Sequence, residues 1–119
     1  MKRLSLFIYF FLITVLQAAA QQSFDKTAVK SVMKRVADWQ IANPNKGAEH
    51  DDLDWTHAAL YMGMLDWAEL TEKEDSDDSY YQWLLRIGQR NHFQIGKWMY
   101  HADFIAVGQP FIDLYLKYG

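Results

Sequence analysis

Two short clusters of aromatic, acidic and imidazole side chains are the residues of this sequence best suited to chemistry. Asp54 and Trp55 follow one polar stretch, and Trp98, His101 and Asp103 follow a second break in the hydrophobic pattern. Aromatic rings stack on the flat faces of sugars, and carboxylates transfer protons when sugar linkages are cleaved. The two clusters together therefore suggest a site that binds or cleaves a carbohydrate.

Each of these residues also has a purely structural interpretation. Asp54 and Asp103 stand where aspartates commonly cap helix N-termini, and Trp55 and Trp98 are of a type that commonly fills a core. The combination is more informative than any single residue, because both clusters precede predicted helices. In a ring of helical hairpins the equivalent N-termini would surround one end of a central cavity, where His101 would join them.

A run of acidic residues raises the question of a metal site. Residues 49–52 (EHDD) combine three carboxylates with an imidazole. Adjacent residues rarely point at one ion without a dedicated loop, so a solvated acidic loop is favoured over a metal site. Neither a glycine-rich phosphate loop nor a serine-centred nucleophile motif is present in the sequence. We therefore expect no metal and no cofactor.

Helical periodicity dominates the part of the chain that must position these clusters. Apolar residues from position 29 to 39 predict a first helix that begins at Ser23 or Asp25 and stops at residues 43–44 (NP). A polar loop follows over residues 45–54. Asp54 then caps a second helix over residues 55–70, whose apolar arc is wide enough for burial on more than one side.

The C-terminal half repeats the arrangement of helix, loop and helix. A charge-rich break covers residues 71–79, Asp78 or Ser79 caps a third helix, and an aromatic-rich loop spans residues 91–101. A fourth helix is expected over residues 103–117, with Pro110 marking a kink or a restart. The sequence contains no strand pattern, so we expect an all-α fold of about four helices arranged as hairpins.

The N-terminus has the pattern of a cleavable secretory signal peptide over residues 1–20. Lys2 and Arg3 precede an apolar run at residues 4–16, and small residues at 18–20 predict cleavage after Ala20. The run is shorter than the roughly 20 residues that span a bilayer, so we expect no stable membrane insertion after cleavage. The expected location is the periplasm or the cell exterior, and the absence of cysteine excludes disulfides.

The charge balance argues against one class of partner. Removing Lys2 and Arg3 lowers the 12 basic residues to 10, against 15 acidic ones, which leaves a net charge of −5. Nucleic acids and anionic membranes are bound by clustered lysine and arginine. We therefore expect neither as a partner.

Two ordered motifs resemble one family. Residues 54–64 (DWTHAALYMGM) resemble the DWT-x-x-A-L-Y-x-G opening of the unsaturated glycosyl hydrolases of families 88 and 105. Residues 100–109 (YHADFIAVGQ) resemble their H-A-D-x-x-x-V-G-Q segment, and residues 113–115 supply the D-L-Y that follows. The resemblance covers most of residues 21–119 and implies that this domain is the N-terminal, incomplete part of an (α/α)6 barrel of the six-hairpin glycosidase type.

The resemblance also implies an activity. Such a hydrolase removes a terminal unsaturated uronic acid from lyase-generated oligosaccharides, for example rhamnogalacturonan fragments of pectin, by hydrating the vinyl-ether double bond of the sugar. Asp103 matches an active-site aspartate and Trp55 matches the aromatic wall of the site, while Asp54, His101 and Trp98 are expected to bind substrate. A basic residue is expected near the substrate carboxylate; the candidates are Arg86, Arg90 and Lys97.

The chain departs from the family pattern at two points. Phe104 stands where members often carry a second acidic residue directly after the first, and the aspartate usually given the acid/base role should lie beyond Gly119. We therefore expect residues 21–119 alone to be poorly stable and catalytically silent, because helices cut from a ring expose apolar flanks. Two alternatives remain open, a non-catalytic carbohydrate-binding helical module and a helical interaction protein whose aromatic residues are only core.

Overall fold

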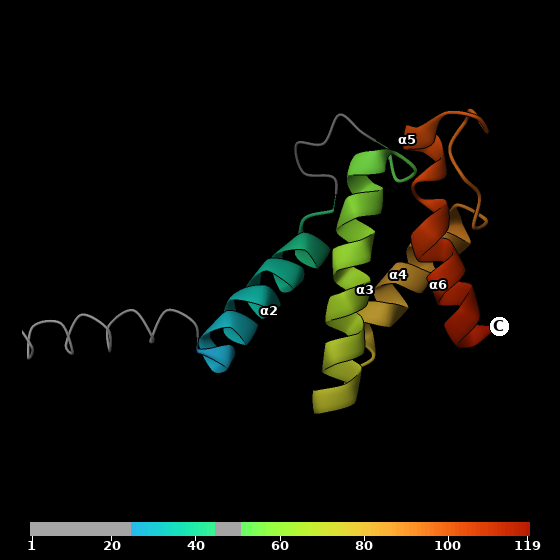
Figure 1. The fold of residues 1–119 in the computed structure, drawn as a ribbon. Coiled ribbons are helices and arrows are strands. Elements are labelled where there is room, and N and C mark those ends of the chain that lie inside the picture. Colours follow the sequence, from blue (N-terminus) through green and yellow to red (C-terminus); the bar gives the residue numbers. More distant parts are fainter. Residues whose placement is uncertain (1–24, 45–50) are drawn as a thin grey trace, which may run out of the picture. The chain divides into compact units, whose positions relative to one another are not determined.

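The computed structural model describes residues 25–44 and 51–119, and the regular structure of these residues is helical. Its elements are α2 (Lys26–Ala42), α3 (Trp55–Asp75), α4 (Ser79–Arg90), α5 (Ala102–Ile105) and α6 (Gly108–Tyr118) (Figure 1). No strand occurs among the described residues, so the predicted all-α class is confirmed. The predicted signal peptide and residues 45–50 of the first predicted loop lie outside the described residues.

The chain divides into two compact units, and the boundary between them, at Val36 and Ala37, falls inside α2. The ends of α2 are those expected from the sequence. Asp25 caps it, with Oδ2 accepting a hydrogen bond from the Ala28 backbone N–H at 3.2 Å. At the other end the Asn43 side-chain amide donates to the Trp39 carbonyl at 2.8 Å. Local capping therefore sets both ends of this helix.

Helix α3 is longer than predicted. The charge-rich residues 71–75 continue the helix, so the expected break over residues 71–79 is wrong, and only residues 76–78 separate α3 from α4. Thr71 is buried, and its hydroxyl donates to the Trp67 carbonyl at 3.1 Å. The helix ends where Ser76 adopts a left-handed conformation (φ 57°) and its N–H reaches the Glu72 carbonyl. Glutamate and lysine are good helix formers, so charge alone did not end the helix.

The core of the second unit lies where α3 contacts α4 and α6 (Figure 1). Its largest fully buried side chains include Tyr61 from α3, Tyr80 and Leu84 from α4, and Leu114 from α6. The Tyr80 hydroxyl donates to the Asp38 carboxylate at 2.6 Å, so its polar end is satisfied. Because buried residues of α3 point in several directions, the prediction that this helix is covered on more than one side is confirmed.

The predicted fourth helix is two helices. Helix α5 ends at Ile105, the chain turns at residues 106–107, and α6 restarts at Gly108. Val107 is completely buried in this turn, which anchors the break to the core. Pro110 falls in the first turn of α6, where backbone N–H groups lack helical partners in any case, so the predicted restart is confirmed.

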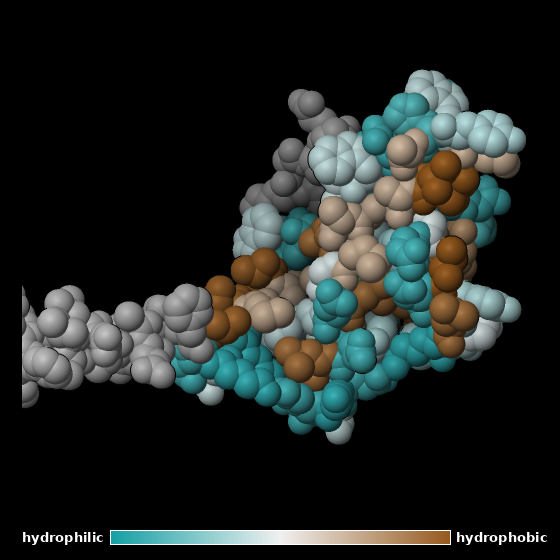
Figure 2. Space-filling view, viewed as in Figure 1, coloured by the Kyte–Doolittle hydropathy of each residue, from teal (hydrophilic) through white to brown (hydrophobic). Residues whose placement is uncertain are grey.

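Apolar side chains remain exposed along α6. Figure 2 shows hydrophobic surface over this helix, where Ile112 is 54% exposed and Leu116 is 76% exposed. Among the described helices, none is both long and apolar enough to cross a membrane. The second unit therefore presents apolar surface along α6.

Candidate functional site

The first part of the candidate site is the N-terminus of α3. Asp54 caps this helix, as predicted, because its Oδ1 accepts from the Thr56 backbone N–H at 3.0 Å and from the Thr56 hydroxyl at 2.9 Å. Trp55 begins the helix with 51% of its surface exposed. Asp54 is therefore held by the helix that it caps, and Trp55 leaves an aromatic surface open to solvent.

The second part is the segment of residues 96–104, which leads into the first turn of α5 and is closed by a hydrogen bond of its own backbone. The Gly96 N–H donates to the Phe104 carbonyl at 2.9 Å. A Cβ at Gly96 would lie 2.0 Å from Cδ1 of Phe104, so only glycine permits this close approach. Within the loop the His101 N–H donates to the Trp98 carbonyl at 3.0 Å. We call residues 96–104 the Trp98 loop. Its backbone hydrogen bonds bring Trp98 and His101 together.

The Trp98 loop carries an ordered aromatic surface. The Trp98 ring packs edge-on against Phe104, with centroids 5.4 Å apart, and lies 5.8 Å from the His101 ring. Trp98 nevertheless remains 56% exposed. Lys97 places its ammonium nitrogen 5.8 Å from the centre of the Trp98 ring. A ring that is held on one edge and open elsewhere can receive the apolar face of a sugar without first being ordered.

Asp103 stands next to His101 in this loop. His101 Nδ1 lies 3.7 Å from Asp103 Oδ2, and both side chains are about half exposed. His101 occupies the N-cap of α5 and Asp103 lies in its first turn, so the structural interpretation of Asp103 as an N-cap is wrong. An exposed carboxylate beside an imidazole can exchange protons with a bound molecule.

The two parts of the candidate site belong to neighbouring helix ends. Helix α5 contacts α3, and Figure 1 shows it beside the N-terminal end of α3. The structure thus brings Trp98 and Asp103 each against His101 and places Asp54 and Trp55 at the start of the adjacent helix. The predicted roles of these residues in binding and catalysis remain predictions.

A third polar group, around Asp52, was not recognised as part of this region from the sequence. Arg90 Nε and Nη2 donate to the two oxygens of Asp52, each at 2.7 Å, and the Asn91 side chain donates to Oδ2 at 2.9 Å. The Asp52 side chain is only 15% exposed. The interpretation of residues 49–52 as a solvated acidic loop is therefore wrong for Asp52, although no group of described residues could hold a metal ion.

This pairing changes the interpretation of Arg90. Arg90 Nε and Nη2 donate to Asp52, so these two nitrogens are not free to bind a substrate carboxylate, the role for which Arg90 was one of three candidates. Lys97 lies beside Trp98, so this residue remains a candidate for that role. Arg86 is exposed on α4.

His57 and Tyr61 of α3 lie next to the group formed by Asp52, Arg90 and Asn91. With Asp52 and Arg90 they line a small cavity of about 90 Å³. His57 is 8% exposed, and its Nδ1 has no hydrogen-bond partner among the described residues. Burial and the negative charge of Asp52 raise the pKa of Tyr61, so its hydroxyl stays protonated at neutral pH. The cavity is thus bordered by an ionised carboxylate and a neutral phenol.

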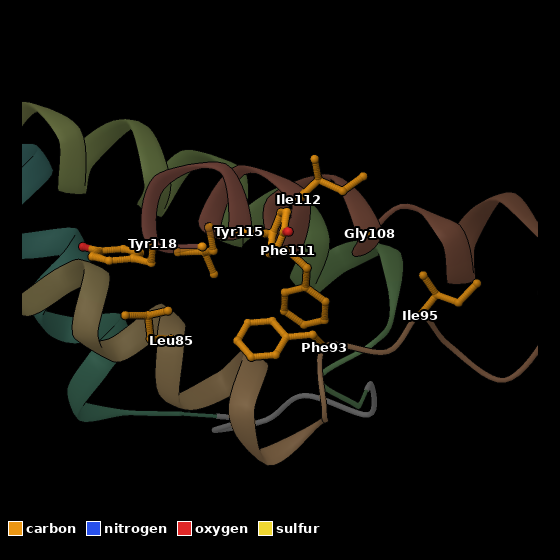
Figure 3. Close-up of a pocket in the computed structure, with 10 residues that line it drawn as sticks. Leu85, Phe93, Ile95, Gly108, Phe111, Ile112, Tyr115 and Tyr118 are labelled. Atoms are coloured by element: carbon orange, nitrogen blue, oxygen red, sulfur yellow. The ribbon is translucent and has the colours of Figure 1, made fainter.

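A larger cavity lies elsewhere and is mostly apolar. About 590 Å³ of space separates α4 from α6, and Figure 3 shows Phe93 and Phe111 facing each other at its edge. Its lining contains no carboxylate or imidazole and none of the five candidate residues. This cavity therefore offers a mostly hydrophobic surface, with Tyr115 and Tyr118 in its lining.

Comparison with known proteins gives one match. The sequence profile described as Glycosyl Hydrolase Family 88 matches residues 26–119. No curated protein and no solved structure matches the chain significantly. The profile covers both motif segments and every helix described above.

Proposed function

Since this chain belongs to glycosyl hydrolase family 88, we propose that it removes a terminal unsaturated uronic acid from oligosaccharides released by a polysaccharide lyase. Membership in a glycoside hydrolase family implies a carbohydrate substrate. The observation that carries the narrower proposal is the Trp98 loop, where an open aromatic ring, an imidazole and a carboxylate stand together. These are the groups needed to hold a sugar ring and to move a proton at it.

The proposed reaction is hydration of the vinyl-ether double bond. One double-bond carbon takes a proton, and water adds to the carbon that bears the ring oxygen. The resulting hemiketal opens, and the next sugar leaves with its oxygen protonated. Asp103 is the proposed proton-transfer group in this chain, because its carboxylate is exposed beside His101. Trp98 and Trp55 would stack on the substrate, and Asp54 would hold the end of α3 in place.

Export is part of the proposal. Residues 1–20 have the composition of a signal peptide, and lyase products of large polysaccharides arise outside the cytoplasm. Mass spectrometry of the periplasmic and extracellular fractions tests this point. A protein that begins at Gln21 is expected there, and a protein that retains Met1 in the cytoplasm would contradict export.

Replacing Asp103 by asparagine tests the catalytic proposal. The measurement is the loss of ultraviolet absorbance of the conjugated double bond, with the protein expressed from its complete reading frame. We expect Asp103→Asn to lower turnover by about 100-fold or more, as for the loss of a general acid or base. Affinity, followed by tryptophan fluorescence, should change little.

The same measurements separate the alternatives. Sugar binding without turnover in the unmodified protein would favour a carbohydrate-binding module, and neither binding nor turnover with any uronate oligosaccharide would favour an interaction protein. Unchanged turnover in Asp103→Asn would remove Asp103 from the mechanism. The matched control is Asp66→Asn, which makes the same change at an exposed position of α3.

A further inference from the structure

Asp52, Arg90 and Asn91, here called the Asp52 tie, connect the two chain segments on which the candidate site is built. Asp52 lies 38 residues before Arg90 in the sequence. Both oxygens of its carboxylate accept hydrogen bonds from the Arg90 guanidinium. The Asn91 amide also donates to the Ile87 carbonyl at 2.9 Å, so it is fixed to the end of α4. A paired arginine and carboxylate with two parallel hydrogen bonds fixes orientation as well as distance.

On one side, the tie holds the entrance to α3. The Leu53 N–H donates to Oδ1 of Asp51 at 2.8 Å, and the Asp54 N–H donates to the Asp51 carbonyl at 3.2 Å. These hydrogen bonds restrict the backbone between Asp52 and Asp54, the N-cap of α3. The position of Asp52 therefore determines where Trp55 begins its helix.

On the other side, the tie holds the start of the segment that leads to the Trp98 loop. The Phe93 N–H donates to the Gly88 carbonyl at 2.8 Å, and the Gln94 N–H donates to the Asn91 carbonyl at 3.1 Å. Gly88 and the Phe93 ring are so close that a Cβ at Gly88 would lie 2.2 Å from that ring. The segment after Asn91 is therefore pinned before it reaches residue 96.

We propose that the Asp52 tie is a positioning device that sets the separation between Trp55 and the Trp98 loop. The proposal rests on the function proposed above for that site. Asp52 and Arg90 act through the backbone segments that they join and touch no substrate. A displacement of about 1 Å in a binding or catalytic group can cost on the order of 100-fold in rate, so a fixed separation matters for a two-part site.

A distance measurement tests the tie without any sugar. The chain contains no cysteine, so Ala59→Cys, at an exposed position of α3, and Met99→Cys, at a position 64% exposed, can carry a specific pair of spin labels. We expect one narrow distance distribution in the labelled parent. Asp52→Asn should broaden or shift it, whereas an unchanged distribution in Asp52→Asn would overturn the proposal.

The matched control is Glu72→Gln, because Glu72 pairs with Lys117 at 2.5 Å between α3 and α6. Like Asp52→Asn, this variant removes one carboxylate from an ion pair between segments far apart in the sequence, but Glu72 lies near the C-terminal end of α3. It should leave the distribution unchanged; broadening as large as in Asp52→Asn would show general loosening and overturn the proposal. If Asp52→Asn does not fold, Arg90→Lys keeps the charge and removes the paired geometry, and the same criteria apply.

A binding measurement then relates the tie to the sugar site. The probe is the disaccharide of unsaturated galacturonate and rhamnose, titrated by tryptophan fluorescence below the melting temperature of every variant. We expect affinity to fall about tenfold or more in Asp52→Asn, as for residues that orient a site, and to be unchanged in Glu72→Gln. Equal affinity in both variants would overturn the link to binding. If the parent binds no uronate sugar, the proposed function fails. The distance measurement still tests whether the Asp52 tie sets the separation between Trp55 and the Trp98 loop.

Discussion

At Asp52, burial and charge act in opposite directions. Burial alone would raise the pKa of this carboxyl, but hydrogen bonds from Arg90 and Asn91, with the positive charge of Arg90, hold the pKa below its ordinary value of 3.8. The folded protein therefore binds the ionised form more strongly than the unfolded chain does. Stability from this source is fully present above about pH 4 and is lost as the pH falls through the lowered pKa.

This linkage predicts how an Asp52→Asn variant differs from the parent. At neutral pH the variant should be less stable by about 1.5 to 3 kcal/mol, the range for hydrogen bonds to charged groups. The difference should shrink below about pH 4, because the parent then loses the same charge. Urea unfolding at a series of pH values measures it, and a difference that does not depend on pH would contradict the role of the charge.

Two glycines differ in the space available for a side chain. A Cβ at Gly96 would collide with Phe104, whereas a Cβ at Gly63, in the interior of α3, meets nothing within 4 Å. We expect Gly96→Ala to lower the free energy of unfolding by about 1 to 3 kcal/mol through overpacking. Gly63→Ala should raise it by about 0.5 to 1 kcal/mol, because alanine favours the helix. Chemical denaturation compares them, and equal effects would contradict the close approach in the Trp98 loop.

Helix α6 is fastened to its neighbours through Lys117. Its ammonium pairs with Glu72 and lies 4.3 Å from the centre of the Tyr81 ring, and the hydrogen bond to Glu72 raises the lysine pKa. Because this group is near the surface, we expect Lys117→Met to cost only about 0.5 to 1 kcal/mol.

The Lys117 effect should depend on salt. At about 1 M salt the Debye length falls to about 3 Å, so the difference in unfolding free energy between the parent and Lys117→Met should become smaller. A difference that is the same at low and high salt would assign the effect to the apolar stem of the lysine instead of its charge. Thermal unfolding at two ionic strengths distinguishes these outcomes.

For the second unit as a whole, the exposed apolar flank of α6 matters most. Ile112 and Leu116 are four residues apart, on one helix face, and each is more than half exposed. Exposed apolar patches promote association. We expect the combined change Ile112→Glu and Leu116→Lys, which preserves net charge, to reduce self-association measured by sedimentation or light scattering.

The control for this prediction is Gln82→Glu with Arg86→Lys on α4. It creates a Glu–Lys pair with the same spacing at exposed positions but removes no apolar side chain. Association should then remain that of the parent, apart from the small effect of one added charge. Equal reduction in both variants would show that charge, and not the apolar flank, controls association.

Several features of this molecule follow from short stretches of sequence. The caps by Asp25 and Asp54 and the restart near Pro110 depend on residues within one helical turn. The two motifs also indicated the family, which the profile match over residues 26–119 confirms. Such features can be predicted from the sequence because capping, proline geometry and helical periodicity depend on residues close together in the chain.

Other features depended on the tertiary structure. The acidic run before α3 gave no sign that Asp52 would pair with an arginine 38 residues later, because only the packing of α3 against α4 brings them together. The burial of Thr71 accompanies the continuation of α3 through a charged segment, and the burial of Val107 accompanies the break between α5 and α6. The local sequence was thus sufficient to predict the starts of α2 and α3 and to indicate the family of the chain. The tertiary structure decided which polar groups became partners, because desolvation and long-range pairing exist only in the folded chain.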